Sequence, residues 1–318
     1  MGQRSSGDER RQVGEDFDWL RAECGGQRGE VGDVRQAGVG QGYFLLREEW
    51  GENRDNGAKR APANAVVVLS RDMLEGAMRN ANLLATPDET ECRAKTHIIH
   101  VWSDDRLINP VPKSASHEAH RLGVLDRFVV QYSGNHGRFH DIETFLGIAK
   151  TFANDTRFAL QFIGEGQKKA MVDGYIKTEH PRAIYASTYV PKEMLADSLA
   201  MADLGVVALM SGQERVCYPS KLLGVMAAGR AILAICPPDC EMGRMIREHE
   251  LGWVVANGDI EGGHQAVLEA QADKRRVARM GENAARLLRE RFTLAQAADA
   301  YWALITGHAP WGSKSSAL

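Results

Sequence analysis

The sequence predicts an α/β protein built on a parallel sheet with helices on both faces. Between residues 128 and 255, short apolar runs of strand length alternate with stretches of helical character. The runs are Phe128 to Tyr132, Phe158 to Ile163, Leu204 to Leu209, Ile232 to Ile235 and Trp253 to Val255. Such alternation is typical of parallel sheets, because each helix carries the chain back to the start of the next strand. Ligands bind these sheets at the carboxyl ends of the strands, so the loops after the runs are the candidate site.

The composition bounds the class of protein. The 318 residues are 44% hydrophobic, enough for one large core or two modest ones. The 39 Lys and Arg nearly balance the 42 Asp and Glu, which disfavours a nucleic-acid partner. The cysteines are odd in number and scattered, and the close pair, Cys236 and Cys240, has the spacing of neither a metal knuckle nor a disulfide framework. Reduced thiols in a cytoplasmic protein are therefore expected.

The sequence carries no signal for secretion or for spanning a membrane. No stretch approaches the ~18 apolar residues that cross a bilayer. Residues Met1 to Leu20 are charged where a signal peptide is apolar. We therefore expect a cytoplasmic protein and leave open a peripheral contact with the inner face of the membrane, which needs only an amphipathic surface.

The chain before residue 127 differs from the regular part. Residues 1–61 are rich in Gly, Arg, Glu, Gln and Asp, with an apolar run at Tyr43 to Leu46, and have no periodicity that would bury a core. We expect this segment to be disordered or foreign to the fold, such as an altered start or reading frame, and to allow short helical patches. Residues 62–126 contain two strand-like runs, a helix that Ser70 would cap, and a Pro-rich connector, which together indicate the remnant of a second domain.

The regular part, residues 127–306, is predicted to form one domain. It ends in two helices between Asp273 and Ile305, each with an apolar stripe, and residues 307–318 are expected to be a disordered tail.

Two glycine-rich loops follow the first two strands of this domain. Residues Tyr132 to Arg138 pair two glycines with a positive charge before a helix, which suits a diphosphate, although a tight structural turn has the same pattern. Residues Phe162 to Lys169 repeat the strand, glycine pair and helix. Ala170 stands near the place of the third glycine of a dinucleotide fingerprint, which weakens an NAD interpretation.

A third segment, Tyr218 to Ala234, is the most specific. Pro219 and Ser220 are predicted to open a short helix that Gly229 closes before a strand, so that the positive end of the helix points into the cleft at the strand ends. The Met-Ala-Ala-Gly part of this segment, residues 226–229, is explained equally well by a structural role, as the capped end of a helix that packs in the core.

Taken in order, these motifs resemble family 4 glycosyltransferases, which have the GT-B fold. The motifs are Tyr-Ser-Gly-Asn-x-Gly-Arg at 132–138, Phe-Ile-Gly-Glu-Gly at 162–166, Tyr-Val-Pro at 189–191, Pro-Ser-Lys at 219–221, Met-Ala-Ala-Gly-Arg at 226–230 and Asp-Cys-Glu at 239–241. The resemblance covers residues 64 to 304 and is greatest to the WbuB-like and WcaI-like enzymes of exopolysaccharide and O-antigen synthesis.

The resemblance implies that 127–306 is the Rossmann-like carboxyl-terminal half of a GT-B fold, which holds the sugar donor. The implied reaction transfers a sugar from a nucleotide-diphosphate sugar to a saccharide or undecaprenyl-linked acceptor, with retention and without a bound metal or other cofactor. Arg138 and Lys221 would stabilise the leaving diphosphate. The implied donor-binding residues are Gly134, Asn135, Gly137, Gly164, Val190, Pro219, Ser220 and Glu241.

Two departures from the family pattern leave rival hypotheses. Many members carry two glutamates, with seven residues between them, where this chain has Val216 and Gly224. The glycine-rich acceptor domain is recognisable only as the remnant in 62–126. The chain could therefore be a non-catalytic nucleotide-sugar-binding remnant, since transfer requires both reactants to be held in one cleft. A nucleotide-sugar epimerase, which shares the GT-B architecture, also needs residues from both domains.

Overall fold

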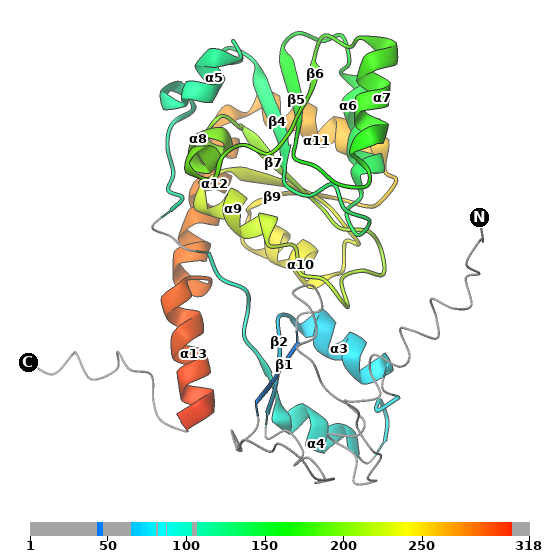
Figure 1. Cartoon of the computed structure of the whole chain (residues 1–318), viewed down its shortest axis with the longest axis vertical. Helices are drawn as coiled ribbons and strands as arrows, with labels where there is room; N and C mark the ends of the chain where they lie inside the picture. The colour runs from blue at the N-terminus through cyan, green and yellow to red at the C-terminus, as the bar shows by residue number, and fades with distance from the viewer. Residues whose placement is uncertain (1–42, 47–64, 81, 87, 104–106, 307–318) are drawn as a thin grey trace, which may run out of the picture. The chain divides into compact units, whose positions relative to one another are not determined.

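The computed structural model describes residues 43–46, 65–80, 82–86, 88–103 and 107–306 (Figure 1). The chain divides into two compact units. The first comprises the chain up to His100, the short segment Arg215–Tyr218 and the chain from Ala298 onward. The second comprises Val101–Glu214 and Pro219–Ala297. Residues 101–126, which belong to the segment 62–126 predicted as remnant and connector, thus group with the second unit.

The described part of the first unit contains a three-stranded sheet with two helices, together with residues 215–218 and 298–306. Its elements are β1 (Tyr43–Leu46), β2 (Ala65–Val68), α3 (Arg71–Asn80), α4 (Asp88–Lys95) and β3 (Thr96–Ile98). Strands β2 and β3 pair in parallel, and α3 and α4 connect them in the sequence, as expected for a βαβ remnant. Strand β1 pairs antiparallel with β2. Strand β1 coincides with the apolar run at Tyr43 to Leu46 inside the segment 1–61, which is expected from the sequence to be disordered or foreign to the fold. Residues 1–42, 47–64 and 307–318 lie outside the described part.

Helix α3 packs against the strands of the first unit. The Met73 backbone N–H donates to the Ser70 hydroxyl over 3.1 Å, which confirms Ser70 as the residue that caps the helix. The core consists of the buried residues Val66, Val68, Met73, Ala77, Met78, Leu83 and Cys92, with Val216 and Tyr218 packed against it. The short segment 215–218 therefore belongs to this core although it lies far away in the sequence.

The second unit has a six-stranded sheet in the order β6-β5-β4-β7-β8-β9, and every pair in it is parallel. Its strands are β4 (Phe128–Ser133), β5 (Phe158–Ile163), β6 (Ile184–Ser187), β7 (Leu204–Ala208), β8 (Ala231–Ile235) and β9 (Gly252–Val255). The strands predicted from the sequence are confirmed. The sequence analysis missed β6, an edge strand in which only Ile184 is buried.

Helices cover both faces of this sheet. They are η1 (Lys113–Ala115), α5 (His117–Arg121), α6 (Ile142–Thr151), α7 (Lys169–Glu179), η2 (Lys192–Met194), α8 (Leu195–Ala200), α9 (Lys221–Ala227), α10 (Glu241–Glu248), α11 (Ile260–Ala272) and α12 (Lys274–Arg291). Helix α13 (Leu294–Thr306) begins in the second unit and belongs to the first from Ala298 onward. Right-handed crossovers put α6 and α7 on one face and α9 and α10 on the other. Helix α6 packs beside α11, and α9 beside α12 (Figure 1). The two terminal helices predicted from the sequence correspond to α12 and α13.

Side chains alternate between the two faces along β4. Val130 and Tyr132 join the large core under α6, α7 and α11, whereas Val129 faces the smaller core that includes Met201. Gln131 also points to that smaller side, where its amide donates to the carbonyl of Ser198 over 2.9 Å. A buried polar side chain is tolerated there because its hydrogen bond replaces the one it had with water.

The strand order defines a topological switch point between β4 and β7. From β4 the chain moves outward through β5 to β6, and it then returns to β7 and continues through β8 to β9. The loops after β4 and β7 consequently leave the same edge of the sheet in opposite directions. A crevice opens at such a point in doubly wound sheets, and ligands bind in it.

The large core gives a stability prediction. Phe145 of α6 is fully buried, and its ring centroid lies 4.5 Å from that of Phe162 on β5. Phe145→Ala should lower the free energy of unfolding by about 3–5 kcal/mol, because it removes apolar contacts and leaves a cavity. Leu125→Ala, at a side chain that is 37% exposed, is the control and should change it by no more than about 0.5 kcal/mol. Urea denaturation measures both, and equal effects would contradict this account of the core.

Candidate functional site

Two loops interlock at the carboxyl edge of the sheet. The first loop, residues 134–141, follows β4, and the second loop, residues 164–168, follows β5. Gly134 N–H donates to the Ile163 carbonyl over 2.8 Å, His136 N–H to Glu165 over 2.7 Å, and Lys168 N–H to His136 over 3.0 Å. These hydrogen bonds join the two glycine motifs into one surface.

Glycine is required at two positions of this surface. Gly134 and Gly164 have φ values of +137° and +128°, which other residues rarely adopt. A Cβ at Gly164 would lie 2.1 Å from the Gly134 carbonyl oxygen, and a Cβ at Gly134 would lie 2.3 Å from Cε of Lys221. The two loops and the Lys221 side chain therefore meet with no space for a side chain between them.

Lys221 reaches this surface from the first residue of α9. Its ammonium lies 2.9 Å from Nε2 of His140 and 5.5 Å from the centroid of the Tyr132 ring. The side chain thus extends across Gly134 and brings its charge to the switch point between β4 and β7. The predicted meeting of the first loop and the Pro-Ser-Lys segment at one edge of the sheet is confirmed.

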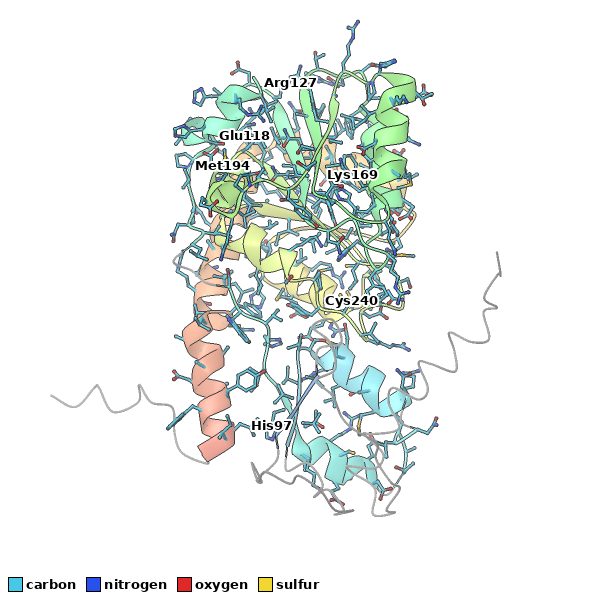
Figure 2. The ribbon with its side chains drawn as sticks, in the orientation of Figure 1. His97, Glu118, Arg127, Lys169, Met194 and Cys240 are labelled. Carbon is cyan, nitrogen blue, oxygen red and sulfur yellow. The ribbon has the colours of Figure 1, made fainter. Side chains whose placement is uncertain are left out.

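Two further lysines add positive charge beside the first loop. Lys168 donates to the His140 carbonyl over 2.7 Å and pairs with Glu143 over 2.8 Å. Lys169, buried at the start of α7, pairs with Asp173 over 3.1 Å. In Figure 2, Lys169 and Cys240 lie beyond the carboxyl ends of the strands, whereas Arg127, at the top of the view, precedes β4 at the opposite edge.

Two histidines of the first loop are buried and uncharged near neutral pH. Burial, and to a smaller extent the charge of Lys169, lower the pKa of His136 to about 4. Burial, and then the charge of Lys221, likewise lower the pKa of His140 to about 4. The His136 ring lies against Tyr132, with centroids 5.1 Å apart, and packs as an apolar group. His140 instead makes hydrogen bonds through both ring nitrogens.

Three more residues predicted for the donor site, Asn135, Gly137 and Arg138, lie on the first loop. Asn135 is exposed, and a Cβ at Gly137 would lie 2.9 Å from its side-chain amide nitrogen. Arg138 is exposed, with its guanidinium 4.8 Å from the centroid of the Phe139 ring. Their contacts with a donor stay predictions.

The other predicted residues lie on the neighbouring loops. Val190 packs its side chain against the smaller core, which leaves its backbone as the group that could meet a base. Pro219 is buried, while Ser220 is exposed and makes no side-chain hydrogen bond that caps α9. Glu241 begins α10 after β8, one strand further from Gly134 than α9.

The sequence analysis missed His140 and Lys168. His140 follows the first motif by two residues and Lys168 lies inside the second glycine-rich segment, but their roles depend on partners that the fold brings from elsewhere in the chain. The available signal was the pair His136 and His140, spaced by four residues, in a loop that also holds two glycines and an arginine.

Val216 and Gly224, which stand where many family 4 glycosyltransferases carry two glutamates, lie in different units. Val216 packs in the core of the first unit. Gly224 lies in α9, where a Cβ would meet Leu199 Cδ1 at an ordinary 3.7 Å. Steric exclusion of a side chain therefore does not explain the glycine at 224.

The buried histidines predict a pH dependence of stability. An unfolded histidine binds its proton near pH 6.5, whereas the pKa values of folded His136 and His140 are about 4. Between these values the unfolded chain binds more protons, so the free energy of unfolding should fall as the pH falls from about 6.5 to 4. The expected slope is up to about 1.4 kcal/mol per pH unit for each histidine.

His140→Gln separates this effect from the titration of carboxylates. Urea denaturation from pH 8 to pH 4.5 should show the variant losing stability less steeply than the parent below pH 6.5, while the two curves run parallel above pH 7. Curves that stay parallel throughout would show that His140 is not held neutral by the fold.

The contact between the glycine loops gives a second prediction. Gly164→Ala should cost about 1–3 kcal/mol of stability, because alanine disfavours that φ and its Cβ forces the loops apart. Gly174→Ala is the matched control, since Gly174 is exposed within α7 and a Cβ there would meet nothing within 4 Å. This control should be neutral or stabilising, by up to about 1 kcal/mol. Thermal melts compare the two, and equal melting temperatures would contradict the proposed tight contact.

Among the described residues, no helix has the length and apolar character needed to cross a membrane.

No protein-family model matches the chain.

Comparisons with known proteins agree with the architecture. A curated protein described as probable glycosyltransferase WbjE, from Pseudomonas aeruginosa, is 29% identical over 194 residues, which are 60% of this chain and 45% of that protein. The chain thus spans less than half the length of the curated relative it matches.

Solved structures of the same fold include sucrose-phosphate synthase from Thermosynechococcus elongatus, with a TM-score of 0.60 at 18% identity over 76% of this chain and 58% of that one. HepE from Anabaena in complex with UDP-glucose has a TM-score of 0.59 at 15% identity over 77% of this chain and 64% of that one. The expected fold, a Rossmann-like parallel sheet like the carboxyl-terminal half of a GT-B protein, is confirmed.

Proposed function

We propose that this chain is the donor-binding part of a glycosyltransferase. It would transfer a sugar from a nucleotide-diphosphate sugar to a saccharide or undecaprenyl-linked acceptor, with retention of configuration and without a metal. The observation that carries the proposal is the meeting of Lys221 with the two glycine loops at the switch point of the sheet. The glycosyltransferase relative and the UDP-glucose complex of HepE, which has the same fold, support it.

The chemistry of the site suits a diphosphate. The half-buried Gly134 and Gly137 carry no side chain that would keep phosphate oxygens from their backbone, and Lys221, Lys168 and Arg138 supply positive charge around this backbone. Lys221 and Arg138 would stabilise the negative charge that develops on the departing nucleoside diphosphate. This electrostatic role needs groups that are already in place when the bond to the sugar breaks.

The other predicted residues would bind the rest of the donor. We assign the backbone around Val190 to the base, Pro219 and Ser220 to phosphate and ribose, and Glu241 to the ribose or the sugar. The hydroxyl of Ser220 supports its assignment, because it is exposed and is not used to cap α9. The order of the motifs further supports membership of family 4, in the WbuB-like and WcaI-like branch that builds bacterial polysaccharides. The proposed location is the cytoplasm, peripheral to the inner face of the membrane.

A second candidate function is donor binding without transfer. The described part of the first unit holds one three-stranded sheet, whereas an acceptor domain in this family is a full Rossmann-like domain. Catalysis requires that acceptor and donor be held together. Binding of a sugar nucleotide with neither transfer nor hydrolysis of the donor would select this candidate.

Calorimetry on the purified chain tests donor binding. UDP, GDP and their sugar conjugates are titrated, and at least one of them should bind. Lys221→Ala and Arg138→Ala should each weaken that binding by about 1–3 kcal/mol, the scale of a lost charge-assisted hydrogen bond.

The matched control is Lys177→Ala, which removes an exposed lysine from the last turn of α7. It should leave the affinity unchanged, and thermal melts should show all three variants folded. A folded chain that binds none of these nucleotides would refute the donor site. Unchanged affinity in Lys221→Ala and Arg138→Ala would remove these two side chains from it.

A further inference from the structure

We propose that His140 is a positioning residue that holds the Lys221 ammonium toward the diphosphate through a direct hydrogen bond. The inference rests on the proposed function, because it assigns His140 to the same donor site. His140 itself would not touch the donor. It would act by fixing where the charge of Lys221 lies.

The hydrogen bonds of the imidazole fix its tautomer. Nδ1 lies 2.9 Å from the carbonyl oxygen of Ala208, the last residue of β7. A carbonyl can only accept, so Nδ1 carries the proton and donates it. Nε2 is then the acceptor, and it lies 2.9 Å from Nζ of Lys221. His140 is 9% exposed, so water competes little for either bond.

The direction of this bond is set by the neighbours of the ring. A protonated imidazole would offer a second donor to an ammonium group, which can only donate, and like charges would repel. Burial and the charge of Lys221 keep the ring neutral, with a pKa lowered to about 4. The pair therefore holds one positive charge, which lies on the lysine. The lysine donates one of its hydrogen bonds to Nε2 of His140.

The His140 backbone carries a related contact. Its carbonyl accepts from Lys168 Nζ over 2.7 Å, while its ring accepts from Lys221. His140, in the loop before α6, thus orients two cations: Lys221 at the start of α9 and Lys168 just before α7. Rotamer freedom of a lysine opposes ligand binding, so a preset ammonium reduces the entropy that the donor must overcome.

Two amide substitutions separate the functions of the ring. The amide of asparagine falls near Nδ1, so His140→Asn can keep the bond to Ala208 but cannot reach Lys221. The amide of glutamine falls near Nε2, so His140→Gln can still accept from Lys221. If positioning matters, His140→Gln keeps the affinity for a nucleoside diphosphate and His140→Asn loses it. A merely structural role predicts that loss of affinity follows loss of thermal stability in both variants.

The experiment is a double-mutant cycle on the full chain, with UDP and GDP as calorimetric probes. His140→Asn should weaken binding at least about threefold, and by no more than Lys221→Ala does, because it acts through that lysine. In the Lys221→Ala background, His140→Asn should have no further effect beyond about twofold. His264→Asn is the control, since it removes another hydrogen-bonded histidine, one that contacts Thr151 at the end of α6.

The outcomes distinguish the two proposals. A wild-type chain that binds neither probe nor their sugar conjugates refutes the donor site, and the inference with it. Binding that weakens in Lys221→Ala but stays equal or tightens in His140→Asn overturns the inference alone, as do additive effects in the cycle. If His140→Asn does not fold, ¹⁵N NMR of the histidines replaces it. Lys221→Ala should then shift the Nε2 resonance of His140, and an unchanged resonance would overturn the contact.

Discussion

The close approach of Gly134 and Gly164 is the constraint on which the candidate site depends. Parallel pairing of β4 with β5 ends both strands at one level, and a Cβ at Gly164 would collide with the Gly134 carbonyl. With both side chains absent, the two loops close on each other and leave a path across Gly134 for the lysine of α9. A larger residue at either place would separate the charge from the backbone that surrounds it.

Burial and charge act together around this contact. Lysines gather at the carboxyl edge, and the imidazoles beneath them remain neutral because water cannot stabilise their charged form. The positive charge is therefore concentrated on side chains that reach the crevice. Such an arrangement favours an anion at the switch point of the sheet, which is where the topology alone would place a ligand.

The sequence predicted the sheet of the second unit well, because buried parallel strands are continuous apolar runs that need no knowledge of their partners. It missed β6, whose Tyr185 and Ser187 are not buried and leave no such run. The glycines and Lys221 were found because motifs of backbone and charge are local. The role of His140 was not, since its partner Lys221 lies 81 residues away in the sequence and only the strand order β4-β7 brings them together.

The short segment 215–218 has a consequence for how the protein can be dissected. Its residues Val216 and Tyr218 pack in the core of the first unit, yet the chain on either side of it belongs to the second. A single proteolytic cut near residue 100 therefore cannot release the second unit intact. A fragment starting at Val101 would carry these two side chains without the core that covers them, and its solubility would depend on replacing them with polar residues.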